Sequence, residues 1–253
     1  MTVRVRKNLG RRVGGLLVAA GATLALAGCG SDDSSSADAS GSDTSGAVST
    51  TAAKDGLDDA KKLVLPADQF PAGYVVQEIP AGQLEATTDQ LLDAMKGVEV
   101  TPASCAQLTL LPDSIDVSSI GLAVAMKGSA SLSTSVAPAQ VSMADQRKSV
   151  SGKCANLKMK FTEGQTAGTT ATVDQKVLKA PKTKADQTMV VEQKTTMNVS
   201  GTTVNSLARM GYAEVNGYQV SVQYMAAPGS TIDSAAFDKT FIAAVNRAVE
   251  GTD

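Results

Sequence analysis

The fold is decided by one continuous stretch, which consists of Leu207–Val215 (LARMGYAEV), Asn216-Gly217 and Tyr218–Met225 (YQVSVQYM). An Asn-Gly pair between two strand-like runs predicts a β-hairpin, because a type I′ turn needs a positive φ at both central residues. A two-residue loop then pairs Val215 with Tyr218, Ala213 with Val220, Gly211 with Val222 and Arg209 with Tyr224. One face of the hairpin therefore sets small residues opposite large ones, as a sheet packed under a helix requires.

The C-terminal segment predicts the helix that packs on this hairpin. Pro228-Gly229-Ser230 precedes it, and Ser230 with Asp233 resembles a capping box, which satisfies free N–H groups of a first helical turn. Apolar residues then recur on one helical face, namely Phe237, Phe241, Ala244, Val245 and Ala248.

Four further helices are expected, at Leu57–Leu65 before Pro66, at Gln83–Lys96, at a short segment around Thr101–Cys105, and at Ser142–Ala155. In the short helix, Thr101 suits the N-cap and Pro102 suits the first helical position, where its missing N–H is no loss.

Further strands are expected at Tyr74–Ile79, Ile120–Met126, Leu157–Phe161 and Met189–Val199. Apolar and polar residues alternate in the last two, which is the period of a half-exposed strand. Consecutive strands with helices at the ends predict an α+β fold, an antiparallel β-sheet packed by helices that include the C-terminal amphipathic helix.

The N-terminus has the features of an export signal. Leu26-Ala27-Gly28-Cys29 follows a basic segment and an apolar run of about 14 residues, too short to span a bilayer. We interpret it as the lipobox of a bacterial lipoprotein, with residues 1–28 as the signal peptide and Cys29 as the lipidated residue. An ordinary cleaved secretory signal is the alternative, but it does not explain a cysteine directly after Leu-Ala-Gly.

Residues 29–53 are expected to form a disordered tether. Gly30–Ala53 consists almost entirely of Ser, Asp, Ala, Gly and Thr, which cannot bury enough apolar surface to fold. Residues 54–253 are long enough for a single α+β extracytoplasmic domain. We therefore expect the protein at the cell membrane, lipid-anchored and facing the extracytoplasmic side.

The net charge argues against nucleic acid as a partner, and we expect none. Five of the 23 basic residues lie in the signal peptide, so the mature chain has 18 basic residues against 25 acidic ones, a net charge of about −7. Proteins that bind the nucleic-acid backbone instead present clusters of Lys and Arg.

Two cysteines remain in the folded part, Cys105 and Cys154. In an exported protein the expected arrangement is one structural disulfide between them. A reactive thiol pair and a metal site are the alternatives, although the spacing is not Cys-x-x-Cys and two thiols without histidine make a poor zinc site.

The sequence contains few residue patterns that support catalysis or metal binding. The absence of histidine removes Ser-His-Asp and Cys-His nucleophile activation and histidine-ligated metals. Asp113 and Asp116 could be paired carboxylates, but they lie in a Pro- and Ser-rich loop. Four lysines surround Pro181 in what we expect to be a solvated loop or a contact for anionic envelope polymers, namely Lys176, Lys179, Lys182 and Lys184. We expect no enzyme activity, no catalytic residue, no cofactor and no bound metal.

The stretch Leu65–Tyr74 (LPADQFPAGY) resembles the opening of a group of actinobacterial lipoproteins with a domain of unknown function. Thr101–Cys105, the later Cys154 and Asn216–Val220 fit the same pattern. More distantly, the chain is similar to the extracytoplasmic sensor domain of the PknH-type serine/threonine kinases. The resemblance implies an antiparallel sheet packed by helices around a ligand-binding cleft. This chain has one candidate disulfide instead of two and no Trp, so no cleft residue is carried over.

Two functions fit these observations. The first is a membrane-anchored cell-envelope lipoprotein whose non-catalytic domain binds a small or lipid-like ligand, since the many Ala, Val, Met and Ser residues can line an adaptable apolar cleft. The second is a lipoprotein that binds or scaffolds an envelope protein partner. An enzyme would need a Lys- or carboxylate-based site that the sequence does not reveal.

Overall fold

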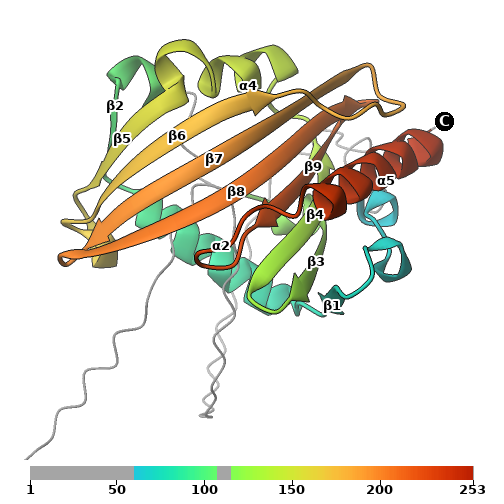
Figure 1. The fold of residues 1–253 in the computed structure, drawn as a ribbon, viewed down its shortest axis with the longest axis horizontal. Coiled ribbons are helices and arrows are strands. Elements are labelled where there is room, and N and C mark those ends of the chain that lie inside the picture. Colours follow the sequence, from blue (N-terminus) through green and yellow to red (C-terminus); the bar gives the residue numbers. More distant parts are fainter. Residues whose placement is uncertain (1–59, 107–114, 253) are drawn as a thin grey trace, which may run out of the picture.

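In this computed structural model, the described residues 60–106 and 115–252 build one nine-stranded sheet with the order β1-β3-β4-β9-β8-β7-β6-β5-β2 (Figure 1). All neighbouring strands pair antiparallel. The strands are β1 Val75–Gln77, β2 Val98–Thr101, β3 Gly121–Lys127, β4 Ala130–Pro138, β5 Asn156–Phe161, β6 Thr170–Leu178, β7 Gln187–Val199, β8 Thr202–Val215 and β9 Tyr218–Met225. The α-helices are α2 Ala81–Met95, α4 Met143–Ser149 and α5 Ser234–Thr252. The predicted α+β fold with an antiparallel sheet is confirmed.

The central hairpin has the predicted register. Val215 pairs with Tyr218, and the pairs continue as Ala213 with Val220, Gly211 with Val222 and Arg209 with Tyr224. Asn216 and Gly217 have φ values of 46° and 82°, the positive values that the turn requires.

Helix α5 lies across β8, β9 and β4 on one face of the sheet (Figure 1). The whole predicted stripe from Phe237 to Ala248 is buried there. Gly211 leaves room for the helix, because a Cβ at this position would lie 2.5 Å from Cδ2 of Phe241. This face holds the largest apolar cluster, to which β4 contributes Leu132 and Val136.

The start of α5 differs from the prediction. Ser230 is not its cap, because Pro228-Gly229-Ser230 forms a turn in which the Ser230 N–H donates to the carbonyl of Ala227. The helix begins at Ser234, and Asp233 caps it by accepting a hydrogen bond of 3.0 Å from the N–H of Ala236.

The face of the sheet away from α5 is covered near β5, at the end of the strand order that lies away from β1. Leu157, Met159 and Phe161 of β5 pack there with Met197 of β7, the buried end of α2 and the two cysteines. Helix α4 covers a neighbouring patch that includes Met189 and Val191. The predicted alternation of β5 and of Met189, Val191 and Met197 is thus confirmed, and the two faces are packed by different helices.

Several boundaries differ from the prediction. The segment Ser142–Ala155 is not one helix: α4 ends at Ser149, and Gly152, with φ 59°, starts the separate short 3-10 helix Gly152–Ala155. Thr101 is not an N-cap, because it is the last residue of β2, and extended Pro102 takes the cap position before the 3-10 helix Ala103–Cys105.

The other expected elements are found with shifted ends. Helix α2 corresponds to the predicted Gln83–Lys96, and β3 to Ile120–Met126. Strand β1 covers only the middle of the predicted Tyr74–Ile79. The predicted helix Leu57–Leu65 is helical over 60–63 and ends before Pro66, while its first residues lie outside the described part.

Candidate ligand-binding cavity

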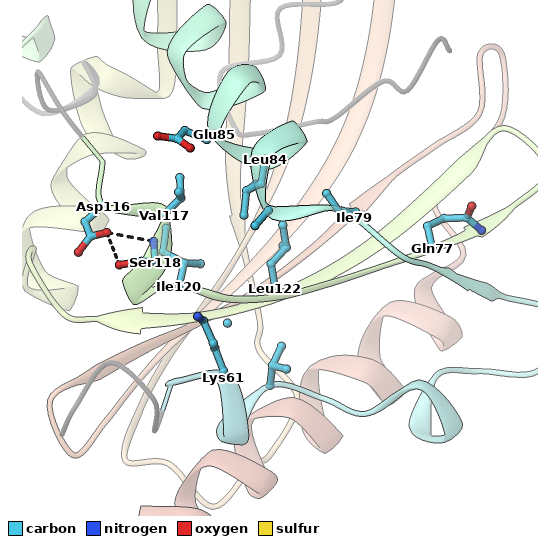
Figure 2. Close-up of a pocket in the computed structure, with 13 residues that line it drawn as sticks. Lys61, Gln77, Ile79, Leu84, Glu85, Asp116, Val117, Ser118, Ile120 and Leu122 are labelled. Carbon is cyan, nitrogen blue, oxygen red and sulfur yellow. Dashed lines mark hydrogen bonds between the residues drawn. The ribbon is translucent and has the colours of Figure 1, made fainter. Parts of the chain in front are cut away.

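An open cavity of about 530 Å³ lies beside the start of β3, on the sheet edge formed by β1 and β3. Five segments meet there: the N-terminal segment 60–65, the end of β1, the first turns of α2, the 3-10 helix Val117–Ser119 and the start of β3. In Figure 2, Leu84 and Ile79 project from the side of α2, opposite Ile120 and Leu122 from the side of β3. Its volume is within the range of small-molecule sites, about 300–1,000 Å³.

The lining is mostly apolar. Six half-buried apolar side chains line it, namely Val64, Ile79, Leu84, Val117, Ile120 and Leu122. Three charged side chains join them, namely Lys61, Glu85 and Asp116, and all three are exposed. An apolar interior with charges at an exposed rim suits a ligand that is itself largely apolar.

Asp116 shapes one wall of the cavity. Its Oδ1 accepts hydrogen bonds from the Ser118 N–H at 3.0 Å and from the Ser118 hydroxyl at 2.6 Å, which caps the 3-10 helix Val117–Ser119. These bonds hold the pKa of the Asp116 carboxyl below its ordinary value, with a smaller contribution from the charge of Lys61. Asp116 is therefore a structural cap, and Asp113, its suggested partner for acid–base chemistry, lies outside the described residues.

The N-terminal wall is held from two sides. The guanidinium of Arg247 on α5 donates from Nε to the carbonyl of Val64 at 2.8 Å and from Nη2 to that of Lys62 at 2.7 Å. On the other side, the backbone of Ala60 comes so close to Gly121 that any Cβ there would collide with its carbonyl. The wall that includes Lys61 and Val64 is thus fixed to both α5 and β3.

A second, smaller cavity of about 180 Å³ adjoins the first. The two cavities share Asp116 and Ile120, so the 3-10 helix Val117–Ser119 lies between them. The remaining lining is Ile115, Ser119, Ala137, Pro138, Gln140 and Gln219. Polar uncharged side chains are therefore more frequent in the second cavity than in the first.

The cysteines form the predicted disulfide. Cys105 and Cys154 are bonded, with their Cα atoms 5.7 Å apart, and both are buried in the cluster under α2. This bond excludes the alternatives of a reactive dithiol and a thiolate metal site, and it indicates an extracytoplasmic compartment. Among the described residues, no three His, Cys, Asp or Glu side chains gather as a metal site.

The lysines around Pro181 were singled out in the sequence, and one of them, Lys184, makes contacts with α5. Lys184 forms an ion pair of 2.6 Å with Glu250 of α5, and its N–H donates to the side chain of Asn246 at 2.9 Å. Lys176 lies in β6, while Lys179 and Lys182 lie in the connection to β7. One of the four lysines is thus used to fix this connection to α5.

Sequence reasoning did not identify the cavity residues. Leu84 carries a signal as an apolar residue on one face of the predicted helix, and Ile120 and Leu122 as part of the apolar run Ile120–Met126. Asp116 is singled out for a different role, as a candidate paired carboxylate. Cys29 lies outside the described residues, so its lipidation stays a prediction. In the described part of the chain, no helix is long and apolar enough to cross a bilayer.

Comparison with known proteins gives little further identification. No protein-family model matches the chain, and no curated protein matches it. Among solved structures, an uncharacterised protein from Mycobacterium smegmatis, described as the Rv0999 ortholog, is similar with a TM-score of 0.44 and 16% identity. That alignment covers 75% of this chain and 99% of the other.

Proposed function

We propose that the chain is a membrane-anchored cell-envelope lipoprotein whose non-catalytic domain binds a small or lipid-like ligand in the 530 Å³ cavity. The observation that carries the proposal is the lining itself: six half-buried apolar side chains, contributed by separate segments, surround a space of ligand size. The resemblance to envelope lipoproteins and to the PknH-type sensor domain supports the same function.

The position of the cavity fits an anchored protein. Lys61 and Val64 belong to the first residues of the described domain and lie eight and eleven residues after the predicted tether, which ends at residue 53. A flexible coil of about 24 residues has a root-mean-square length of roughly 27 Å, which keeps this end of the domain near the membrane. A ligand that leaves the bilayer therefore meets the cavity within a short distance.

The proposal is tested by binding of Nile red, an uncharged apolar dye whose fluorescence increases in an apolar environment. We expect saturable binding that Leu84→Trp weakens at least tenfold, because the indole fills the cavity beside Ile79 and Leu122. Leu92→Trp is the matched control, since Leu92 is a half-buried leucine on the same helix that does not line the cavity. Equal dye binding by both variants would place the apolar site elsewhere and contradict the proposal.

A second candidate function is the binding of an envelope protein partner. Val75 is 65% exposed on β1, which is an edge strand of the sheet. Such an edge can accept a strand from another protein. Val75→Lys should then abolish crosslinking to that partner in cells and leave dye binding unchanged.

A further inference from the structure

We propose that the two adjoining cavities take one amphiphile, with its apolar chain in the first cavity and an uncharged, hydroxyl-bearing head group in the second. This inference rests on the proposed function and names the class of ligand for the same site.

A molecule that passes over one short 3-10 helix would reach both spaces. Asp116 and Ile120 line both cavities, so only the short 3-10 helix that follows Asp116 lies between them. The first cavity, with the apolar lining given above, has nearly three times the volume of the second, at about 530 Å³ against 180 Å³. The larger space suits a hydrocarbon chain and the smaller one suits a compact head group.

The second cavity is lined by hydrogen-bonding side chains from separate segments. They include the carboxamides of Gln140 and Gln219 and the carboxylate of Asp116. Each carboxamide offers two donor hydrogens and an acceptor oxygen, and the carboxylate oxygen is an acceptor. A hydroxyl both donates and accepts, so a head group with several hydroxyls can satisfy this mixed set.

Charge argues against an anionic head group. Neither Lys nor Arg lines the second cavity, while Asp116 supplies a negative charge there. In the first cavity the only cation is Lys61, and it is opposed by Glu85 and Asp116. A carboxylate or sulfate placed between these residues would lose hydration, and its attraction to Lys61 would be offset by repulsion from Glu85 and Asp116, which is unfavourable.

Photocrosslinking on the full-length lipidated chain in membrane vesicles tests this inference. Three probes share one alkyl chain with a diazirine at the same carbon, and they end in maltoside, carboxylate or trimethylammonium. Labelled peptides are mapped by mass spectrometry. We expect the maltoside probe to label residues of the first cavity several-fold more than either charged probe.

Gln219→Leu is the decisive variant, and Gln223→Leu is its matched control. Both glutamines are half-buried on the same face of β9, but only Gln219 lines the second cavity. Loss of the carboxamide should reduce maltoside labelling about three- to tenfold, the range expected for one or two neutral hydrogen bonds. The control should leave maltoside labelling unchanged, and labelling by the charged probes should not depend on either variant.

The possible outcomes separate this inference from the proposed function. Equal or stronger labelling by a charged probe, or maltoside labelling that does not depend on Gln219, would overturn the inference while leaving an apolar ligand site in place. Absence of labelling in the first cavity by all three probes would overturn both. The comparison between probes on the unchanged chain is decisive even where a variant folds poorly.

Discussion

The ring of Phe241 on α5 occupies the space in which a side chain at Gly211 of β8 would lie. A Cβ at Gly211 would be 2.5 Å from Cδ2 and 2.7 Å from Cε2 of this ring. Because the same helix holds the N-terminal wall of the cavity through Arg247, the fit of α5 on the hairpin also positions the site.

Gly211→Ala should therefore destabilise the fold by about 1–3 kcal/mol, the usual cost of overpacking a filled core. Urea denaturation measures this loss. The matched control is Gly82→Ala on α2, where a Cβ would meet no atom within 4 Å. Since alanine favours a helix over glycine, this control should be neutral or gain up to about 1 kcal/mol. Equal losses in both variants would contradict the packing account.

The disulfide should be a main source of stability. It joins residues 49 positions apart, so replacing both Cys105 and Cys154 by serine should cost about 4 kcal/mol through the greater freedom of the unfolded chain. Urea denaturation with and without a reductant checks this value. Reductant should destabilise the unchanged protein and have no effect on the double variant; a reduced protein of unchanged stability would contradict the prediction.

Arg209 and Glu192 should be energetically coupled. Their side chains form an ion pair of 2.6 Å across β7 and β8 and are only 14% and 33% exposed, and the guanidinium also lies 5.8 Å from the centroid of the Phe237 ring. A double-mutant cycle with Arg209→Met and Glu192→Gln should give a coupling energy on the order of 1–2 kcal/mol, since partial burial limits screening by water.

The pair Lys184 and Glu250 is the control for that cycle. Its side chains are 53% and 62% exposed, so its coupling should stay below about 0.5 kcal/mol. Coupling of the same size in both pairs would show that burial does not distinguish them.

Tyr212 should make the protein sensitive to alkaline pH. Burial raises the pKa of its phenol to about 12 from an ordinary value of 10.0, and the hydroxyl donates to Sδ of Met210. The unfolded chain therefore loses this proton more readily, so the stabilisation is complete below pH 10 and is lost as the pH rises towards 12.

Tyr212→Phe should remove this dependence. The free energy of unfolding of the unchanged protein should fall by on the order of 2–3 kcal/mol more than that of the variant between pH 9 and about 12. Urea denaturation across this range measures the difference, and the absorbance of the phenolate follows the titration directly. Parallel pH profiles for the two proteins would contradict the prediction.

Lipidation should depend on Cys29. Cys29→Ser should remove the acyl anchor, because the thiol is the group that is modified, and the protein should lose its diacylglycerol mass and leave the washed membrane fraction or remain unprocessed. Fractionation with mass spectrometry of the N-terminal peptide checks this. Acylated protein in the variant would show that another residue carries the anchor.

The hairpin, α5 and the disulfide could be predicted because their signals are local or few in number. Asn216-Gly217 restricts the turn and thereby sets the register, and the spacing of Phe237 and Phe241 marks one helical face. Only one pair could form between Cys105 and Cys154. The turn and the helical face depend on residues that are close in sequence, and the disulfide follows because the folded part offers one cysteine pair.

Strand β4 and the cavity could not be predicted for physical reasons. In β4 the buried residues Leu132 and Val136 alternate with serines and alanine, so the contrast between its faces is weak. The cavity is lined by segments as distant as Lys61 and Leu122, which only the folded sheet brings together. The sequence alone does not locate the start of α5, because both Ser230 and Asp233 suit a cap and the turn geometry decides between them.

Native mass spectrometry shows directly whether the folded domain holds a ligand. The domain from residue 54 onward, exported so that its cysteines can oxidise, is weighed before and after organic extraction. We expect an adduct that extraction removes, on a chain two hydrogens lighter than the reduced sequence. A clean apo mass in every preparation, together with no uptake of added amphiphile, would contradict ligand binding and favour a protein partner.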